Sequence, residues 1–451
     1  MREVSTRPVG SQAWVRAAIV LGVLAGCLAG GVGPVGAQIT LEVLSGESDP
    51  NSVAAIKEVA NQLQAKHPNV TVQPQFATWG DLYKRTVAAI AAGAPPAIVL
   101  QSDSPAVGLL EQDVLTPMDD LVIQLGREDF FPRALSVFTK DGKVYGVPSI
   151  WNYTIVWYRS DLYEKYGLKA ATTWEEFERN VRTITERTRQ EGNVVYGIGL
   201  PLGTSSACQD ELFHDFVWSN GVTILDRQGN VTFNTPEVIQ ALEFIKQLAA
   251  SAPPDSATYS HLDPLTAFTA GKTAHVIYGG RLMTYLQRNK AELLEKIDAF
   301  LVPKGPSARG RHASFNALKG WIVPKQSAER TALAKEFIAL MESRQNALRW
   351  LQAVPLHHLP ARRSLSQSKE FWDVPLASTR AGKAVVRLAS EATDRYGLFA
   401  TYAAGERNAN VSKVLEAFIP CKSVQQVAVG RTSAAEAAKR GEQEIRQLLG
   451  K

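Results

Sequence analysis

Hydrophobic and polar positions follow two periods after residue 38. Residues 39–44 alternate as in a strand, whereas apolar side chains in residues 53–63 recur at the spacing of one helix face. A strand over 70–72, a helix over 79–93 and a strand over 95–100 repeat the order. This strand-loop-helix repetition predicts an α/β lobe with a mostly parallel sheet.

Polar side chains follow two of the predicted strands. Glu47 lies in the loop after the first strand, and Gln101, Ser102 and Asp103 follow the third strand. Trp79 opens the helix between them. Ligands in such sheets bind beyond the carboxyl ends of the strands, where helix N-termini and free N–H groups also point. We therefore expect these five residues to line a ligand site.

The segment from Tyr145 to Leu168 contains a predicted crossing between domains followed by a predicted buried strand. Pro148 lacks an N–H and suits a crossing segment, whereas residues 154–158 are β-branched and aromatic and predict a buried strand. Side chains suited to a small polar ligand lie between them, namely Trp151, Asn152 and Tyr153. An ordinary loop with a packed tryptophan is the alternative interpretation, and Trp157 inside the strand is expected to be core.

The Gly-Val-Pro segment, the following strand and the run Asp-Leu-Tyr-Glu-Lys-Tyr-Gly-Leu at 161–168 resemble the extracellular solute-binding proteins of bacterial ABC importers. The similarity is to the carbohydrate and glycerol-phosphate group of that family, to which maltose-binding protein is related. Three further segments, at 234–244, 268–281 and 430–437, match the family in the same order. The resemblance extends from Ile39 to Leu449.

This resemblance implies a two-lobed α/β fold of the periplasmic-binding-protein type (type 2), with ligand held between lobes that close by hinge motion. Three crossings are expected near 145–148, 300–303 and 354–360. The expected boundaries are residues 38–146 and 303–354 for lobe 1, and residues 147–302 and 355–451 for lobe 2. The implied function is that of the substrate-binding subunit of an importer, which captures a sugar, oligosaccharide or polyol for a membrane permease.

The resemblance also implies site residues in the second half of the chain. Trp218 and Gly280 fall at matching positions, and Asn316 stands where relatives often carry a Gly-Gly pair. Arg281 stands where many relatives place a stacking tryptophan. Arg407 is the nearest candidate for a late arginine that holds an anionic group in the glycerol-phosphate branch. Two such arginines favour a phosphate or carboxylate ligand. Glu47 could instead accept hydrogen bonds from hydroxyl groups, so a neutral glycan is the alternative ligand.

The composition is that of an ordinary globular protein, with 45% hydrophobic and 21% charged residues. The net charge is +5, of which three arginines and one glutamate before residue 38 contribute +2. The remaining +3 is too small for a nucleic-acid-binding surface. Residues 1–37 read as an export signal, cleaved after Ala37 or lipidated at Cys27, and either route places the protein outside the cytoplasmic membrane.

The remaining cysteines, Cys208 and Cys421, either pair in an oxidising compartment or stay as free buried thiols. No cluster has metal spacing, His357 and His358 are expected at the surface, and no cofactor is expected. A secreted glycosidase would need two carboxylates that face each other across a cleft. The candidate acids are Asp103, Asp210 and Glu211, and nothing in their spacing along the chain pairs them. We expect a monomeric binding protein without catalysis, although a ligand-sensing module would have the same sequence features.

Overall fold

The computed structural model describes residues 38–205, 207–403 and 406–451. The expected export signal, with both processing positions at Cys27 and Ala37, lies outside the described residues. Within them, no helix combines the length and the apolar character that crossing a membrane requires.

The larger sheet confirms the alternation expected from the sequence. Its strands β1 (Ile39–Ser45), β2 (Val70–Phe76) and β3 (Ile98–Ser102) pair in parallel. Helices α1 (Pro50–Lys66) and α2 (Trp79–Ala91) connect them. The full order is β11-β6-β10-β3-β1-β2, with β12 paired to β10.

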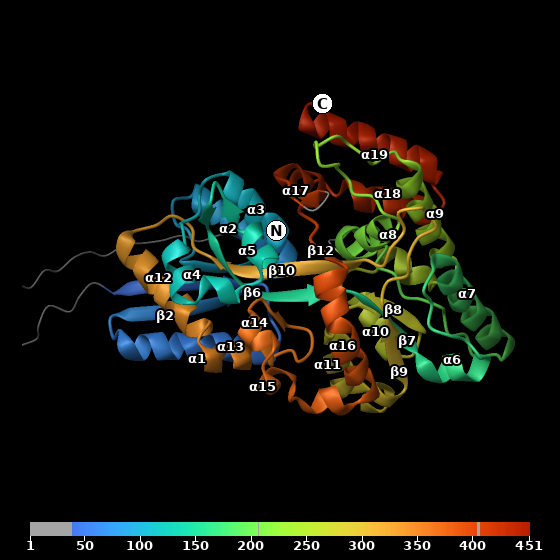
Figure 1. Cartoon of the computed structure of the whole chain (residues 1–451), viewed down its shortest axis with the longest axis horizontal. Helices are drawn as coiled ribbons and strands as arrows, with labels where there is room; N and C mark the ends of the chain where they lie inside the picture. Colours follow the sequence, from blue (N-terminus) through green and yellow to red (C-terminus); the bar gives the residue numbers. More distant parts are fainter. Residues whose placement is uncertain (1–37, 206, 404–405) are drawn as a thin grey trace, which may run out of the picture. The chain divides into compact units, whose positions relative to one another are not determined.

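Two long antiparallel strands complete this sheet. β6 (Gly146–Tyr153) and β10 (Ser314–Ile322) lie side by side, and β10 also pairs with β3 (Figure 1). Gly146 and Gly320 are required by packing, because a Cβ at either would lie 2.7 or 2.5 Å from the Phe138 ring. The sheet thus places segments from both halves of the chain side by side.

A smaller antiparallel sheet has the order β8-β7-β9. Its strands are β7 (Ile155–Arg159), β8 (His275–Tyr278) and β9 (Ile297–Phe300), and Trp157 in β7 is fully buried as expected. The apolar composition of residues 196–200 predicts a further short strand, which is wrong, since this segment makes only isolated bridges, at Tyr196 and Gly199.

The chain passes between the two sheets at Thr154. The Thr154 hydroxyl donates to Asp215 at 2.9 Å, and its N–H donates to the Ser314 hydroxyl at 3.1 Å. The N–H of Phe315 donates to the same Asp215 carboxyl at 2.7 Å. One buried carboxyl therefore ties the outgoing passage at Thr154 to the returning one at Ser314.

Local signals set the helix ends as the sequence predicts. Thr173 and Glu176 form a reciprocal capping box at the start of α7 (Trp174–Gln190). α6 (Ser160–Tyr166) ends at Gly167 with φ of 66°, a conformation that favours glycine. Ser327 and Ser433 also cap their helices through the expected side-chain bonds.

The other elements cover the two sheets. The further α-helices described are α3 (Asp103–Glu111), α4 (Asp119–Gln124), α5 (Pro132–Val137), α8 (His214–Ser219), α9 (Pro236–Ala249), α10 (Asp263–Thr269), α11 (Arg281–Asn289), α12 (Ala328–Met341), α13 (Arg344–Leu351), α14 (Arg363–Ser366), α15 (Lys369–Trp372), α16 (Arg380–Ser390), α17 (Ala409–Glu416), α18 (Ile419–Ala428) and α19 (Ala434–Leu449). The short strands are β4 (Thr139–Lys140), β5 (Lys143–Val144), β11 (Leu359–Pro360), β12 (Gly397–Leu398), β13 (Tyr402–Ala403) and β14 (Glu406–Arg407). The 3₁₀ and π segments are η1 (Arg127–Asp129), η2 (Cys208–Phe213), η3 (Pro254–Thr258), η4 (Ala291–Glu295), η5 (Pro375–Ser378) and η6 (Glu391–Arg395).

Two hydrophobic cores hold these elements. One packs on the large sheet and includes Leu41, Ile98 and Trp321, and the other packs α7, α8, α9, α18 and α19 around residues such as Phe177 and Trp218. We refer to the elements around them as the first and second lobe. β6 and β11 lie in the large sheet, and the residue boundaries expected for the lobes stay a prediction.

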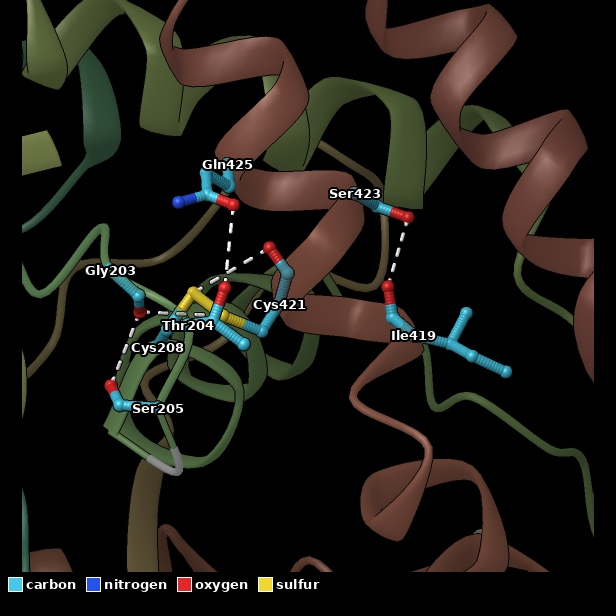
Figure 2. The surroundings of a disulfide bond; sticks show 8 residues. All are labelled: Gly203, Thr204, Ser205, Cys208, Ile419, Cys421, Ser423 and Gln425. Carbon is cyan, nitrogen blue, oxygen red and sulfur yellow. Dashed lines mark hydrogen bonds between the residues drawn. A yellow bond between two sulfur atoms is a disulfide. The ribbon is translucent and has the colours of Figure 1, made fainter. Parts of the chain in front are cut away.

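A disulfide joins Cys208 and Cys421, the pairing that the sequence left open. It connects the π-helical segment η2 to helix α18, and the two Cα atoms lie 5.4 Å apart (Figure 2). Both cysteines are fully buried.

Candidate functional site

A buried ionic cluster centres on Glu47, in the loop after β1. Its carboxylate contacts Arg281 at 2.7 Å and Lys319 at 3.0 Å, and the His358 ring nitrogen lies 3.5 Å away. Burial alone raises the pKa of this carboxyl, but the charges of Lys319 and Arg281 outweigh it and hold the pKa well below its ordinary value. Glu47 is 1% exposed, so the cluster contains a carboxylate balanced by two cations.

Lys319 extends this cluster to β6. Its ammonium donates to the side-chain oxygen of Asn152 at 2.9 Å, and the amide nitrogen of Asn152 contacts the His357 ring. The sequence did not point to Lys319, although a lone lysine inside an apolar strand was a usable signal. His357 and His358 were expected at the surface, which is wrong, because both are buried around this ionic cluster.

Trp79 covers the same cluster from the start of α2. Its half-buried ring lies 4.8 Å from the Lys319 ammonium. The ring also packs against Gly46, where a Cβ would lie 2.5 Å from ring carbons. A glycine before Glu47 is therefore needed for the ring to approach the loop.

Three acids that the sequence could not pair act on one another here. Asp103 follows β3, and Asp210 and Glu211 belong to η2. Burial raises the pKa of Asp103 to about 7, and it raises the pKa of Asp210 well above its usual value, with the Asp103 charge adding to the shift. Burial also raises the pKa of Glu211, and the neighbouring Asp210 charge adds to it. Acids from both lobes therefore share one poorly solvated region.

Glu211 is linked to the remaining polar groups through His261. The two side chains approach to 3.7 Å, and the His261 ring bonds the Tyr278 hydroxyl at 2.8 Å. The Tyr278 ring stacks near His357, with ring centroids 6.1 Å apart. The Glu211 and His261 side chains are 16% and 39% exposed, so solvent reaches this part of the site.

Several buried polar atoms have no hydrogen-bond partner in the described part of the chain. They include the Gln101 amide nitrogen, one carboxyl oxygen each of Asp103 and Asp210, and one ring nitrogen of His357. Buried polar groups are normally bonded, so each is a position where a ligand could supply the missing partner. Ser102 is half-buried and bonds the Gln101 side chain through its N–H at 3.0 Å.

Other expected residues are occupied by contacts within the protein. The Tyr153 hydroxyl donates to the Leu356 carbonyl at 2.8 Å, and the Asn316 amide donates to the Ala392 carbonyl at 3.1 Å. A Cβ at Gly280 would lie 2.1 Å from the Leu356 oxygen, so this glycine admits neighbouring backbone.

Trp151 and Trp218 lie in aromatic surroundings. Trp151 is 4% exposed and packs between Phe131 and Phe399, with centroids 5.1 and 6.1 Å away. Trp218 stacks on Phe315 and also borders a cavity of about 400 Å³ whose lining includes Tyr402. The volume lies in the range of small-ligand pockets.

Arg407 is paired away from the Glu47 cluster. Its guanidinium contacts Glu111, at the end of α3, at 2.7 Å, and the same carboxylate contacts Lys140 at 3.1 Å. Each of the two guanidinium groups, of Arg281 and of Arg407, has a carboxylate partner within the protein. These contacts do not test whether both arginines bind one anionic group of a ligand, so that expectation stays a prediction.

Comparisons with known proteins agree with this architecture. A family model described as bacterial extracellular solute-binding protein matches residues 48–348. The putative ABC transporter periplasmic-binding protein YcjN of Escherichia coli K12 is 24% identical over 344 residues, which cover 74% of this chain and 76% of that protein.

Solved structures show the same two-lobed fold. Maltose-bound MalE3 of T. maritima superposes with a TM-score of 0.74 and 21% identity, covering 91% of this chain and 100% of that one. A solute-binding protein of Agrobacterium radiobacter K84 in complex with ribitol gives a TM-score of 0.75 and 18% identity, with 91% and 99% covered.

Proposed function

Because this chain belongs to the bacterial extracellular solute-binding proteins, we propose that it binds one small, neutral, polyhydroxylated solute between its lobes and delivers it to an ABC permease. Similar structures are described with maltose and with ribitol, a sugar and a polyol. The solute class proposed here therefore includes sugars, oligosaccharides and polyols.

The observation that carries this proposal is the pair of unpartnered carboxyl oxygens on Asp103 and Asp210. Asp103 extends from the first lobe and Asp210 from the second. Burial raises the pKa of both carboxyls, and the Asp103 charge adds to the shift at Asp210. A hydroxyl group can donate to a carboxylate or accept from a protonated carboxyl. A ligand with several hydroxyls would satisfy both lobes at once, and its binding would favour the arrangement that brings them together.

An anionic solute fits this arrangement less well. Arg281 and Lys319 are both in contact with Glu47, and Arg407 is in contact with Glu111. A phosphate or carboxylate at the Glu47 cluster would have to replace one of these pairs and then lie close to Asp103 and Asp210. The glycerol-phosphate alternative is therefore the less favoured one.

We also propose that the protein turns over no substrate and acts as a monomer outside the cytoplasmic membrane. The three acids lie in a binding-protein framework, where they serve as hydrogen-bonding groups for the solute. Mass spectrometry of the mature N-terminus distinguishes cleavage after Ala37 from lipidation at Cys27.

A thermal-shift panel tests the ligand class. Maltose, ribitol and related sugars and polyols are compared with glycerol 3-phosphate, because a solute bound only by the native state raises Tm. We expect at least one neutral compound to raise Tm in the native chain and to lose that effect in Asp103→Asn with Asp210→Asn. A rise with glycerol 3-phosphate alone would contradict the proposal, and glycoside breakdown beyond one equivalent would contradict the absence of turnover.

A further inference from the structure

The two acids of the second lobe belong to an unusual segment. η2 is a π-helix over Cys208–Phe213, and it contains Asp210 and Glu211 in adjacent positions. π-Helical turns are rare and often occur at functional sites. Two adjacent, partly buried carboxyls add repulsion to this segment, since the Asp210 charge raises the pKa of Glu211.

The first residue of this segment is covalently attached to α18. Cys208 bonds Cys421 two residues before Asp210, and the Cys421 sulfur also lies 3.6 Å from the Gly203 carbonyl. The Thr204 hydroxyl donates to Gln425 of α18 at 3.4 Å (Figure 2). Gly203, Thr204 and Cys208 therefore each contact the same helix.

α18 provides a rigid support for this attachment. It packs against α9 and α19 as well as η2, and Val424 and Val427 are fully buried in the second core. The far side of η2 reaches the site, where Glu211 approaches His261 at 3.7 Å. The disulfide thus joins a core helix to the segment that carries two candidate ligand-binding acids.

We propose that the Cys208–Cys421 disulfide is a positioning element of the solute site, which holds η2 so that Asp210 and Glu211 face the acid and aromatic groups of the first lobe. This inference rests on the proposed function for its link to solute binding. A disulfide between residues 213 positions apart also stabilises the whole fold, so the test must separate positioning from stability.

The first measurement needs no ligand. The proton signals of the His261 ring, assigned with His261→Gln, are followed against pH by NMR. The Glu211 carboxyl lies 3.7 Å from this ring, and the charges of Arg281, Lys319 and Glu47 also act on it. Burial lowers the pKa of His261 itself to about 4, so protonation of the ring gives a separate step near that pH. In the native chain we expect a step above the ordinary range of a carboxyl, because the pKa of Glu211 is raised.

The cysteine variants should move that step. We use two variants without the disulfide: Cys208→Ser with Cys421→Ser, and Cys208→Ala with Cys421→Val, the second of which keeps apolar side chains at both positions. In both, we expect the Glu211 step to move toward the ordinary carboxyl range by about one pH unit or more. A step that stays in place in a folded cysteine-free variant would overturn the proposal. Thr173→Ala with Ser433→Ala is the control, since it removes two helix caps and keeps the disulfide.

The second measurement is the affinity for maltose and ribitol by calorimetry, well below every Tm. We expect about tenfold weaker binding without the disulfide and less than about twofold change in the cap control. Glu211→Gln should weaken binding in the native background and have little further effect in the cysteine-free one. If Glu211→Gln weakens binding equally with and without the disulfide, the disulfide does not act through the position of Glu211. If neither compound binds the native chain, the proposed ligand class fails while the NMR result still decides the positioning claim.

Discussion

The carboxylate of Glu47 contacts the guanidinium of Arg281 at 2.7 Å, although 234 positions separate the two residues in the chain. Glu47 follows the first strand of the large sheet, and Arg281 begins α11 after the small sheet. Lys319 of β10 contacts the other oxygen of the same carboxylate at 3.0 Å. One buried carboxylate therefore joins the loop after β1 to the start of α11 and to the returning strand β10.

Removing this carboxylate should be costly. Glu47→Gln leaves Arg281 and Lys319 without their charged partner, and breaking a buried ion pair costs about 3–5 kcal/mol. The free energy of unfolding in urea measures the loss. Glu42→Gln is the control, since its pair with Arg330 is partly exposed and should contribute at most about 1 kcal/mol. Similar losses in both variants would contradict the role given to Glu47.

A methyl group at Gly46 should displace the Trp79 ring. A Cβ there would lie 2.5 Å from ring carbons, so Gly46→Ala forces the ring away from Lys319. We expect a change in tryptophan fluorescence and about tenfold weaker binding of the best neutral solute by calorimetry.

Gly80→Ala is the matched control for this substitution. A Cβ at Gly80 meets nothing within 4 Å, and alanine favours the helix that begins at Trp79. The control should keep its affinity and be at least as stable as the native chain. Equal affinities of Gly46→Ala and Gly80→Ala for the solute would show that Trp79 does not contribute to solute binding.

Much of this fold could be predicted from periodicity and local signals. The strand-helix alternation up to Ser102 is confirmed. The capping box at Thr173 and the helix end at Gly167 likewise depend on neighbours in sequence, so they too are readable from it. The segment at 196–200 has strand composition but only isolated bridges, because pairing depends on residues far along the chain.

The candidate site was less accessible to sequence reasoning. Glu47, Trp79 and Asp103 could be proposed because each borders a strand end or helix start. Lys319 was missed and His357 misplaced, since their burial depends on how the passages between the lobes meet. The effect of the Asp103 charge on Asp210 likewise arises from segments that only the tertiary structure brings together.

Asp103 should make stability fall as pH rises. Burial raises its pKa from 3.8 to about 7, so the folded state holds the proton more tightly than the unfolded state does. The contribution is fully present below about pH 4 and is lost through about pH 7, on the order of 4 kcal/mol in total. Asp103→Asn should flatten this dependence in urea titrations across pH 4–8, while weakening solute binding. An unchanged pH slope would contradict the assignment.

Trp151 should contribute more to stability than to binding. The sequence indicates Trp151 as a candidate site residue, with a packed tryptophan as the alternative. The ring is 4% exposed and lies between Phe131 and Phe399. We expect a loss of about 3–5 kcal/mol in unfolding free energy, with little change in affinity at a temperature where the variant is folded. A large loss of affinity with native stability would restore Trp151 to the solute site.

Isothermal titration calorimetry with maltose, ribitol and glycerol 3-phosphate tests the central claim most directly. The account predicts that a neutral compound binds one per chain, and that Asp103→Asn with Asp210→Asn weakens it by about a hundredfold, or about 2.7 kcal/mol. Glycerol 3-phosphate should bind weakly or not at all to the native chain. Tighter binding of glycerol 3-phosphate than of either neutral compound, unaffected by the two asparagines, would contradict the account.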